Sequence, residues 1–200
     1  MKKLVLLAVL ALALPTAVFA SSNIDYSNSG GNLSGSHSGL SLNGSTLIAV
    51  NSNAGLITGS DLGSVAFQTG ALQSGTLQNG GTFAAGGWFT ITGNGTNGVP
   101  SGTLFSGTFS GPVTWSMTTL ANGTHNYTLT GALSGTTGSG YSTVGVTVQL
   151  TVNTGKGFFN GCTRISSGDT NVVVPEPGSL SLLGTGLIAL GGMIRRKLKV

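Results

Sequence analysis

Apolar and polar residues alternate along two segments in the second half of the chain. Val113, Trp115 and Met117 alternate with hydroxyl-bearing residues, and Val recurs with Leu at every second position from Val144 to Val152. A period of two places successive side chains on opposite faces of a strand. The pattern therefore predicts a sheet with one buried apolar face and one exposed hydroxyl face.

Ten segments have the composition of strands, because they contain β-branched or aromatic residues and are bounded by Gly, Asn or Pro. They are Thr46 to Val50, Leu56 to Thr58, Ser64 to Thr69, Thr76 to Gln78, Gly87 to Thr92, Gly102 to Phe109, Val113 to Leu120, His125 to Thr130, Ser142 to Val152 and Gly157 to Phe159.

Asn-Gly pairs supply the connections that these strands need, since they adopt the positive φ of type I′ hairpin turns. The pairs begin at Asn43, Asn79, Asn94, Asn97, Asn122 and Asn160. We expect an antiparallel meander in which Trp115 lies near Tyr127 and Leu129 across the Asn122-Gly123 turn.

The predicted fold class is therefore all-β, with an antiparallel β-sandwich as the passenger domain over residues 45–173. Its core should contain most of the aromatic residues, namely Phe67, Phe83, Trp88, Phe89, Phe105, Phe109, Trp115 and Tyr127. The alternative is a β-solenoid, because Ser74-Gly75-Thr76-Leu77 recurs at residues 101–104, although a solenoid needs a fixed period. Residues 21–44 are rich in Ser, Gly and Asn and predict an arm or a first strand.

The N-terminus has the three parts of a secretory signal peptide. Lys2 and Lys3 form a positive start, Leu4 to Leu14 is apolar, and Val18 and Ala20 suit the positions before a cleavage site. We expect an N-terminal signal helix over residues 1–20 and cleavage by signal peptidase after Ala20.

The C-terminus carries an uncharged apolar run from Leu180 to Ile194 and then a basic cluster, defined as Arg195, Arg196, Lys197 and Lys199. A helix over this run covers about 22 Å, against about 30 Å for a hydrocarbon core, and long basic side chains can extend its reach. The alternative of a buried core helix would require a polar stripe. The pattern predicts a membrane helix with a cytoplasmic C-terminus by the positive-inside rule.

A short breaker motif, Val174-Pro175-Glu176-Pro177-Gly178, precedes the apolar run. With the run and the basic cluster, residues 174–200 resemble the PEP-CTERM sorting domain of Gram-negative bacteria. In that family a membrane-embedded cysteine protease-transpeptidase, the exosortase, recognises the Pro-Glu-Pro motif. The resemblance implies that Pro175, Glu176 and Pro177 are the recognition element and that the basic cluster is the stop-transfer end. It also implies export across the inner membrane, transient anchoring, and final placement at the cell surface or outside the cell.

The net charge of +4 misrepresents the passenger domain, because most cations lie at the two ends of the chain. The passenger domain itself contains two cations, Lys156 and Arg164, and three carboxylates, Asp25, Asp61 and Asp169. Without a basic patch the chain has no footprint for nucleic acid. Cys162 is the single cysteine, so no intramolecular disulfide can form, and we expect it to be a small buried hydrophobe.

Candidate catalytic residues are few. His37 lies in a Ser-rich segment, and His125 begins a strand, where we expect it to be exposed. The aspartates lie far apart in sequence, so no paired carboxylates are apparent, and no Gly-x-Ser-x-Gly elbow or metal-ligand spacing occurs. The sequence therefore predicts no catalytic, cofactor-binding or metal site, and no enzyme.

Three functions remain open. The first is an exported, exosortase-processed cell-surface or extracellular-matrix protein without catalytic activity, associated with exopolysaccharide. The second is a surface binding module for carbohydrate or ice; a carbohydrate platform would expose Trp88, Trp115 or Tyr141. The third is a secreted enzyme, which lacks candidates for a general acid or base.

Overall fold

The computed structural model describes residues 21–143 and 145–175. The chain divides into a compact unit over Asn23–Val174 and a second unit made from the two ends, most of which lies outside the described residues. The expected signal helix and membrane helix fall outside them as well. The residues that the structure describes contain strands and no helix. The strands are β1 (Ser21–Ser29), β2 (Asn32–Ser36), β3 (Gly39–Ser52), β4 (Gly55–Gln68), β5 (Leu72–Thr76), β6 (Gly80–Phe83), β7 (Gly86–Asn94), β8 (Ser101–Phe109), β9 (Val113–Thr119), β10 (His125–Thr137), β11 (Gly145–Asn153), β12 (Cys162–Arg164) and β13 (Ser167–Pro175).

All of these strands belong to one hydrogen-bonded sheet, and part of that sheet closes on itself. Neighbouring strands follow the order β11-β13-β1-β3-β4-β7-β8-β10, and β10 also pairs with β11, which completes the circuit. Strands β9, β6 and β5 continue from β10, whereas β2 and β12 branch from β3. Closure removes the two exposed edges that an open sheet of the same strands would have.

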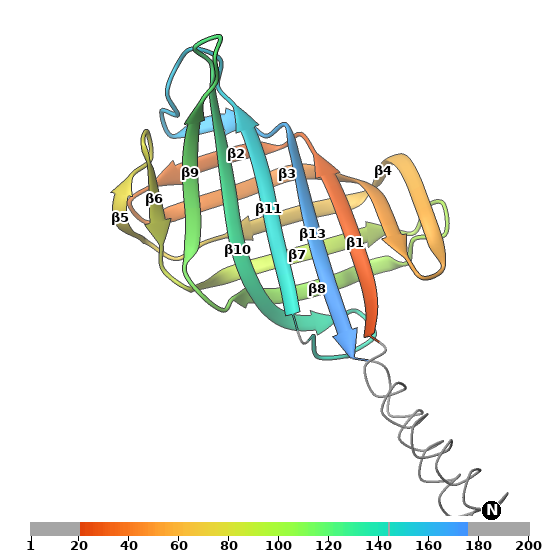
Figure 1. Ribbon diagram of the computed structural model, residues 1–200. Helices are drawn as coiled ribbons and strands as arrows, with labels where there is room; N and C mark the ends of the chain where they lie inside the picture. The colour runs from red at the N-terminus through yellow and green to blue at the C-terminus, as the bar shows by residue number, and fades with distance from the viewer. Residues whose placement is uncertain (1–20, 144, 176–200) are drawn as a thin grey trace, which may run out of the picture. The chain divides into compact units, whose positions relative to one another are not determined.

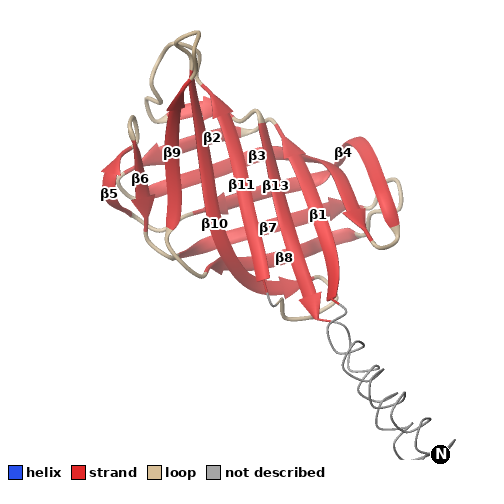
Figure 2. Ribbon diagram, viewed as in Figure 1, coloured by secondary structure: helices blue, strands red, loops and turns tan. Residues whose placement is uncertain are grey.

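The closed sheet folds into two layers whose strands cross steeply (Figure 1). Strands β9, β10, β11, β13 and β1 run in the front layer of the view, and β3, β4, β7 and β8 cross behind them. In orthogonal packing of this kind, strands that bend from one layer into the other form the corners. β10 is such a strand, because residues 125–130 pair with β9 while residues 133–137 pair with β8. Loops join the strands only at the ends of the layers (Figure 2).

The prediction of an all-β antiparallel fold is confirmed, since every resolved strand pairing is antiparallel. A sandwich of two separate sheets is not confirmed, because the two layers are continuous through shared strands. The β-solenoid alternative gains no support from this order of hairpins and crossovers.

The β9–β10 hairpin has the predicted register, whereas other local elements differ from the predictions. Leu129 pairs with Trp115 and Tyr127 with Met117 across the β9–β10 turn, as expected. The Asn43-Gly44 pair is not a hairpin turn; it lies inside β3, where the register with β4 shifts between Leu42 and Ser45. The expected strand at residues 157–159 is absent, and of residues 76–78 only Thr76 lies in a strand, as the last residue of β5. β13 was not expected, because its polar residues weaken the apolar pattern.

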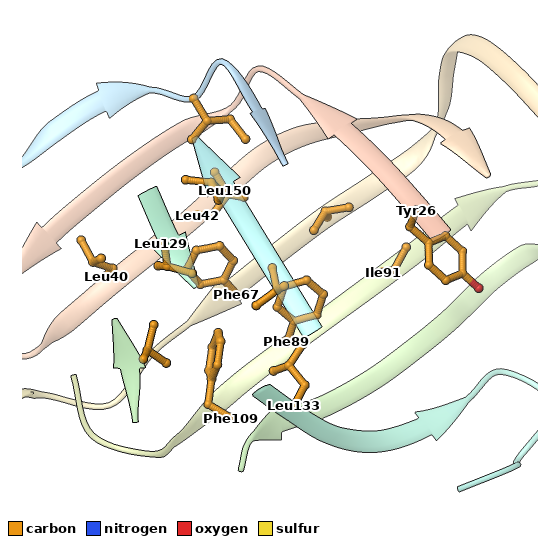
Figure 3. Close-up of a cluster of buried hydrophobic side chains, with 14 of the residues drawn as sticks. Tyr26, Leu40, Leu42, Phe67, Phe89, Ile91, Phe109, Leu129, Leu133 and Leu150 are labelled. Atoms are coloured by element: carbon orange, nitrogen blue, oxygen red, sulfur yellow. The ribbon is translucent and has the colours of Figure 1, made fainter. Parts of the chain in front are cut away.

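The core lies between the two layers and contains side chains from both (Figure 3). Phe67 and Phe89 stack at 5.8 Å between ring centroids, and Phe109 meets both rings edge-on. Aromatic pairs in these arrangements contribute beyond the area that they bury. Seven of the eight aromatic residues expected in the core are buried, and the prediction for Trp88 is wrong, since it is 41% exposed.

A second aromatic group joins β9 and β10 to the turn between β5 and β6. Trp115 stacks on Tyr127 at 5.0 Å, and the ring of Phe159 packs against both. The indole Nε1 of Trp115 donates to the Leu77 carbonyl at 2.9 Å. The Tyr127 hydroxyl donates to the Gln78 carbonyl at 2.6 Å and accepts from the Phe159 amide at 3.0 Å. These rings therefore bury their apolar bodies while their polar atoms satisfy loop backbone groups.

Tyr127→Phe should destabilise the protein by about 1–3 kcal/mol, because the change leaves a buried amide and a carbonyl without a partner. Tyr141→Phe is the matched control, since Tyr141 is 46% exposed and its change should cost less than about 0.5 kcal/mol. Urea unfolding of both variants measures the difference. Equal midpoints for the two variants would contradict this account.

The bend of β10 brings its backbone very close to β8. Gly135 pairs with Gly107, and the ring of Phe105 covers both glycines from inside the core. A Cβ atom added to Gly135 would overlap the Ser106 carbonyl oxygen and lie 2.6 Å from the Gly107 Cα. Only glycine permits this approach without moving one strand.

Gly135→Ala should therefore cost about 1–3 kcal/mol through overpacking. Gly145→Ala on β11 provides the control, because nothing lies within 4 Å of a Cβ added there. That variant should be neutral or slightly stabilising, since alanine restricts the unfolded chain. Thermal unfolding of the two variants gives the comparison, and a stable Gly135→Ala variant would show that the two strands can separate freely.

Candidate functional site

Strand β13 leads directly into the predicted sorting tail. Its inward side chains, Thr170, Val172 and Val174, are buried, and it pairs with β11 from Ser167 opposite Thr151 to Val173 opposite Gly145. The strand ends at Pro175, which has no amide proton to donate to a ladder. The folded domain and the Pro-Glu-Pro motif therefore share a residue.

The first and last strands lie side by side. β1 and β13 are neighbours in the sheet, and Figure 1 shows that they run in opposite directions. The first residue of β1, Ser21, and the last residue of β13, Pro175, therefore lie at the same end of the sheet. The predicted signal cleavage site immediately precedes β1. The predicted signal cleavage site and the Pro-Glu-Pro motif therefore adjoin the ends of two neighbouring strands.

Most of the predicted sorting residues lie outside the described residues. Pro175 ends β13, whereas Ala20, Glu176, Pro177 and the basic cluster fall outside, as does the apolar run from Leu180 to Ile194. Within residues 21–143 and 145–175, no helix has the length and apolarity needed to cross a membrane.

The two histidines do not come together as a catalytic unit. The expectation that His125 is exposed is wrong, since its exposed fraction is 9%. Its ring stacks on Phe158 at 4.5 Å, and its Nδ1 lies 3.1 Å from the Thr119 hydroxyl. His37 is exposed in the β2–β3 turn, where its carbonyl accepts from the Leu72 amide. The His125 ring therefore takes part in local packing, and His37 contributes a backbone hydrogen-bond acceptor.

Two of the aspartates, in contrast, are brought together because β1 and β13 are neighbours in the sheet. Asp25 on β1 and Asp169 on β13 lie on the outer face of adjacent strands, although they are far apart in sequence. Burial raises the pKa of Asp25, and the negative charge of Asp169 raises it further. The sequence missed this pair because nothing in the local pattern showed that the first and last strands are neighbours.

The described His, Cys and Asp residues are also the side chains that could bind a metal ion. In the part of the chain that the structure describes, no three His, Cys, Asp or Glu side chains gather as metal ligands. The prediction that Cys162 is buried is wrong; it is exposed on the short strand β12.

Two open grooves lie on the outer faces of the layers. The larger, about 570 Å³, crosses β9, β10, β11 and β13, and its lining combines hydroxyl and amide side chains with Asp169 and with Pro112, Ala132 and Val148. The smaller, about 180 Å³, lies over β2, β3 and β4 and is lined by serines, glycines and Gln68. Neither groove is enclosed, so both suit extended ligands better than small molecules.

The residues that follow β13 carry a motif that indicates an exported protein with a C-terminal sorting signal. The protein-family model described as the PEP-CTERM protein-sorting motif matches residues 173–197, which confirms the resemblance seen in the sequence. The motif implies processing by exosortase and anchoring in the membrane through a C-terminal signal. No curated protein and no solved structure matches the chain.

Replacing Asp169 by Asn should lower the pKa of Asp25, because it removes a neighbouring negative charge. When folding raises the pKa of a carboxyl, the protein loses stability as the pH rises from the ordinary pKa, here 3.8, through the pKa of the folded state. Asp169→Asn should therefore be more stable than wild type at neutral pH and indistinguishable from it at pH values below both pKa values.

Urea unfolding over a pH series and NMR titration of the Asp25 carboxyl test this expectation. Asp169→Glu is the control, because it keeps the charge and should keep the raised pKa of Asp25. An unchanged Asp25 titration in Asp169→Asn would show that the two carboxylates do not interact.

Proposed function

We propose that this chain is an exported surface protein that exosortase processes at Pro175-Glu176-Pro177. Its β domain then acts without catalysis at the cell surface or in the extracellular matrix, in association with exopolysaccharide. The observation that carries the proposal is the PEP-CTERM motif at residues 173–197, which follows a folded domain with no intervening linker.

The close junction supports processing at the surface of a folded domain. Pro175 ends β13, and only residues 176–179 separate it from the apolar run. Val174 is buried and Val173 pairs with Gly145, so the strand is held until its last residues. A protease that binds Pro175 therefore acts at the margin of the sheet, and the released protein keeps its complete fold.

The outer faces of the sheet support association with a hydrated polymer. The exposed side chains of β10 and β11 are mainly hydroxyls and amides, including Thr130, Ser134, Thr147 and Gln149. Such groups donate and accept hydrogen bonds without the desolvation cost of a charge. Polysaccharide hydroxyls offer the matching donors and acceptors.

The Asp25 and Asp169 pair is the feature nearest to a catalytic arrangement. A raised pKa beside a second carboxylate is typical of acid–base pairs in glycosidases. However, Asp169 is exposed and lies in an open groove, which would not exclude water from a reacting substrate. The pair therefore does not change the proposal of a non-catalytic protein.

Replacing Pro175, Glu176 and Pro177 together with Ala should abolish recognition by exosortase. We expect a larger species that stays in the membrane fraction, because its apolar tail is not removed. Immunoblots of membrane, surface and culture-medium fractions measure size and release. Ser179→Ala, which leaves the motif intact, is the control and should be processed as wild type.

An unchanged size and unchanged release of the triple variant would show that the motif does not direct processing. Since Pro175 also ends β13, proteolytic resistance of the triple variant should be compared with wild type. A folded but unprocessed variant is the expected result.

A further inference from the structure

Trp88 is a large aromatic side chain placed on the outer face of the sheet. The register of β7 with β8 shifts between Gly86 and Phe89, and both Gly86 and Gly87 have positive φ values, 101° and 69°. A bulge of this kind re-aims a side chain. It turns Phe89 into the core and leaves Trp88, 41% exposed, facing outward.

The exposed indole belongs to a row of residues that crosses four strands. Ser34 on β2 pairs with Ser41 on β3, Ser41 with Gln68 on β4, and Gln68 with Trp88 on β7. Paired residues point to the same face, and neighbouring strands are about 4.8 Å apart, so the row is about 14 Å long.

Completely buried side chains on the opposite face of the same strands support this row. The adjacent row on the inner face is Leu33, Leu42, Phe67 and Phe89, and all four side chains are completely buried. The ring of Phe89, next to Trp88 in sequence, packs against Phe67, Phe105 and Phe109. Packing of this kind holds the backbone beneath Trp88 in one position and pre-organises the outer row.

Hydrogen-bonding groups lie beside the indole. Gln68 pairs with Trp88 and also lines the groove of about 180 Å³, together with Ser34, Ser36, Ser38 and Ser41. Among the residues that the structure describes, no side-chain hydrogen bond involves the Gln68 amide, so both its donor and its acceptor can meet a ligand. No charged residue lines this groove.

We propose that the Trp88 row, defined as Ser34, Ser41, Gln68 and Trp88, binds an uncharged polysaccharide chain. A pyranose ring has an apolar C–H face, which can lie on the indole, and a rim of hydroxyls, which the serines and Gln68 can bind. An aromatic surface with a few placed polar groups is the usual composition of a ligand site. This inference rests on the proposed function, since it identifies the surface that contacts exopolysaccharide.

The larger groove fits this ligand less well. Its lining contains no aromatic side chain, and Asp169 adds a negative charge next to Asp25. The lining at the Trp88 row offers acidic polymers no cation to compensate the cost of desolvating their carboxylates, so uncharged chains are the ligand that it selects.

Tryptophan fluorescence can test the proposal, because the chain has two tryptophans and Trp115 is 1% exposed. Iodide quenching of the exported protein should report mainly on Trp88. We expect at least one of three neutral probes, cellohexaose, maltohexaose or laminarihexaose, to protect Trp88 from quenching. An acidic probe, oligogalacturonate, should not protect it.

Trp88→Ala should weaken binding of the protecting probe by about tenfold or more, measured by calorimetry, because it removes the stacking surface. Gln68→Ala should weaken it less. Tyr141→Ala is the matched control, because Tyr141 is an exposed aromatic residue in the loop between β10 and β11, and this variant should bind within about twofold of wild type. Emission from buried Trp115 reports that each variant is folded.

Absence of protection by all three neutral probes would overturn the proposal, as would unchanged binding in Trp88→Ala. Protection that grows with protein concentration and without any probe would instead identify Trp88 as a contact between copies of this chain. Each of these results is independent of the size and release measured for the sorting-motif variant, so failure of the binding site and failure of the sorting proposal can be told apart.

Discussion

The pairing of β10 with three other strands is the constraint on which the arrangement depends. Within β10, residues 125–130 pair with β9, residues 126–133 pair with β11, and residues 133–137 pair with β8. Without the turn of β10 from one layer to the other, the circuit through β13 and β1 would remain open. The Gly107–Gly135 contact allows that turn, because two strands with side chains at those positions could not approach so closely. The absence of Cβ atoms at these two positions therefore permits the close approach of β8 and β10 where β10 bends.

Closure of the circuit also determines where the ends of the domain lie. β1 is joined to β3 by hydrogen bonds, and β13 fills the space between β1 and β11. The last strand thus completes the sheet, which means that the domain is finished only when the residues just before the sorting motif have paired. Thr170, Val172 and Val174 contribute buried side chains to the core. Folding of the domain and presentation of Pro175 at its margin are consequently parts of the same event.

Local sequence patterns predicted individual strands and hairpin turns, which depend on neighbouring residues. They did not predict pairings between strands that are distant in sequence. The alternation from Val113 to Met117 and from Val146 to Val152 correctly indicated strands and their inner faces, and the Asn122-Gly123 turn correctly indicated a hairpin. The single closed sheet was not apparent, because β1 and β13, which are neighbours in it, are far apart in sequence. For the same reason the proximity of Asp25 and Asp169 could not be seen. The tail was recognised because its motif, apolar run and basic cluster are contiguous.

The exceptions to the alternating pattern carry more information about function than the pattern itself. Trp88 and Phe89 are adjacent aromatic residues, and a regular strand must place one inside and the other outside. Hydrophobicity alone does not decide between them, but the Gly86-Gly87 bulge does, because it sets which residue faces the core. Burying Phe89 adds a ring to the Phe67 and Phe109 group, whereas Trp88 retains an indole that can stack on a ligand and an N–H that can donate to it. The exposed indole beside uncharged hydrogen-bonding groups is therefore the observation from which we infer a sugar-binding surface.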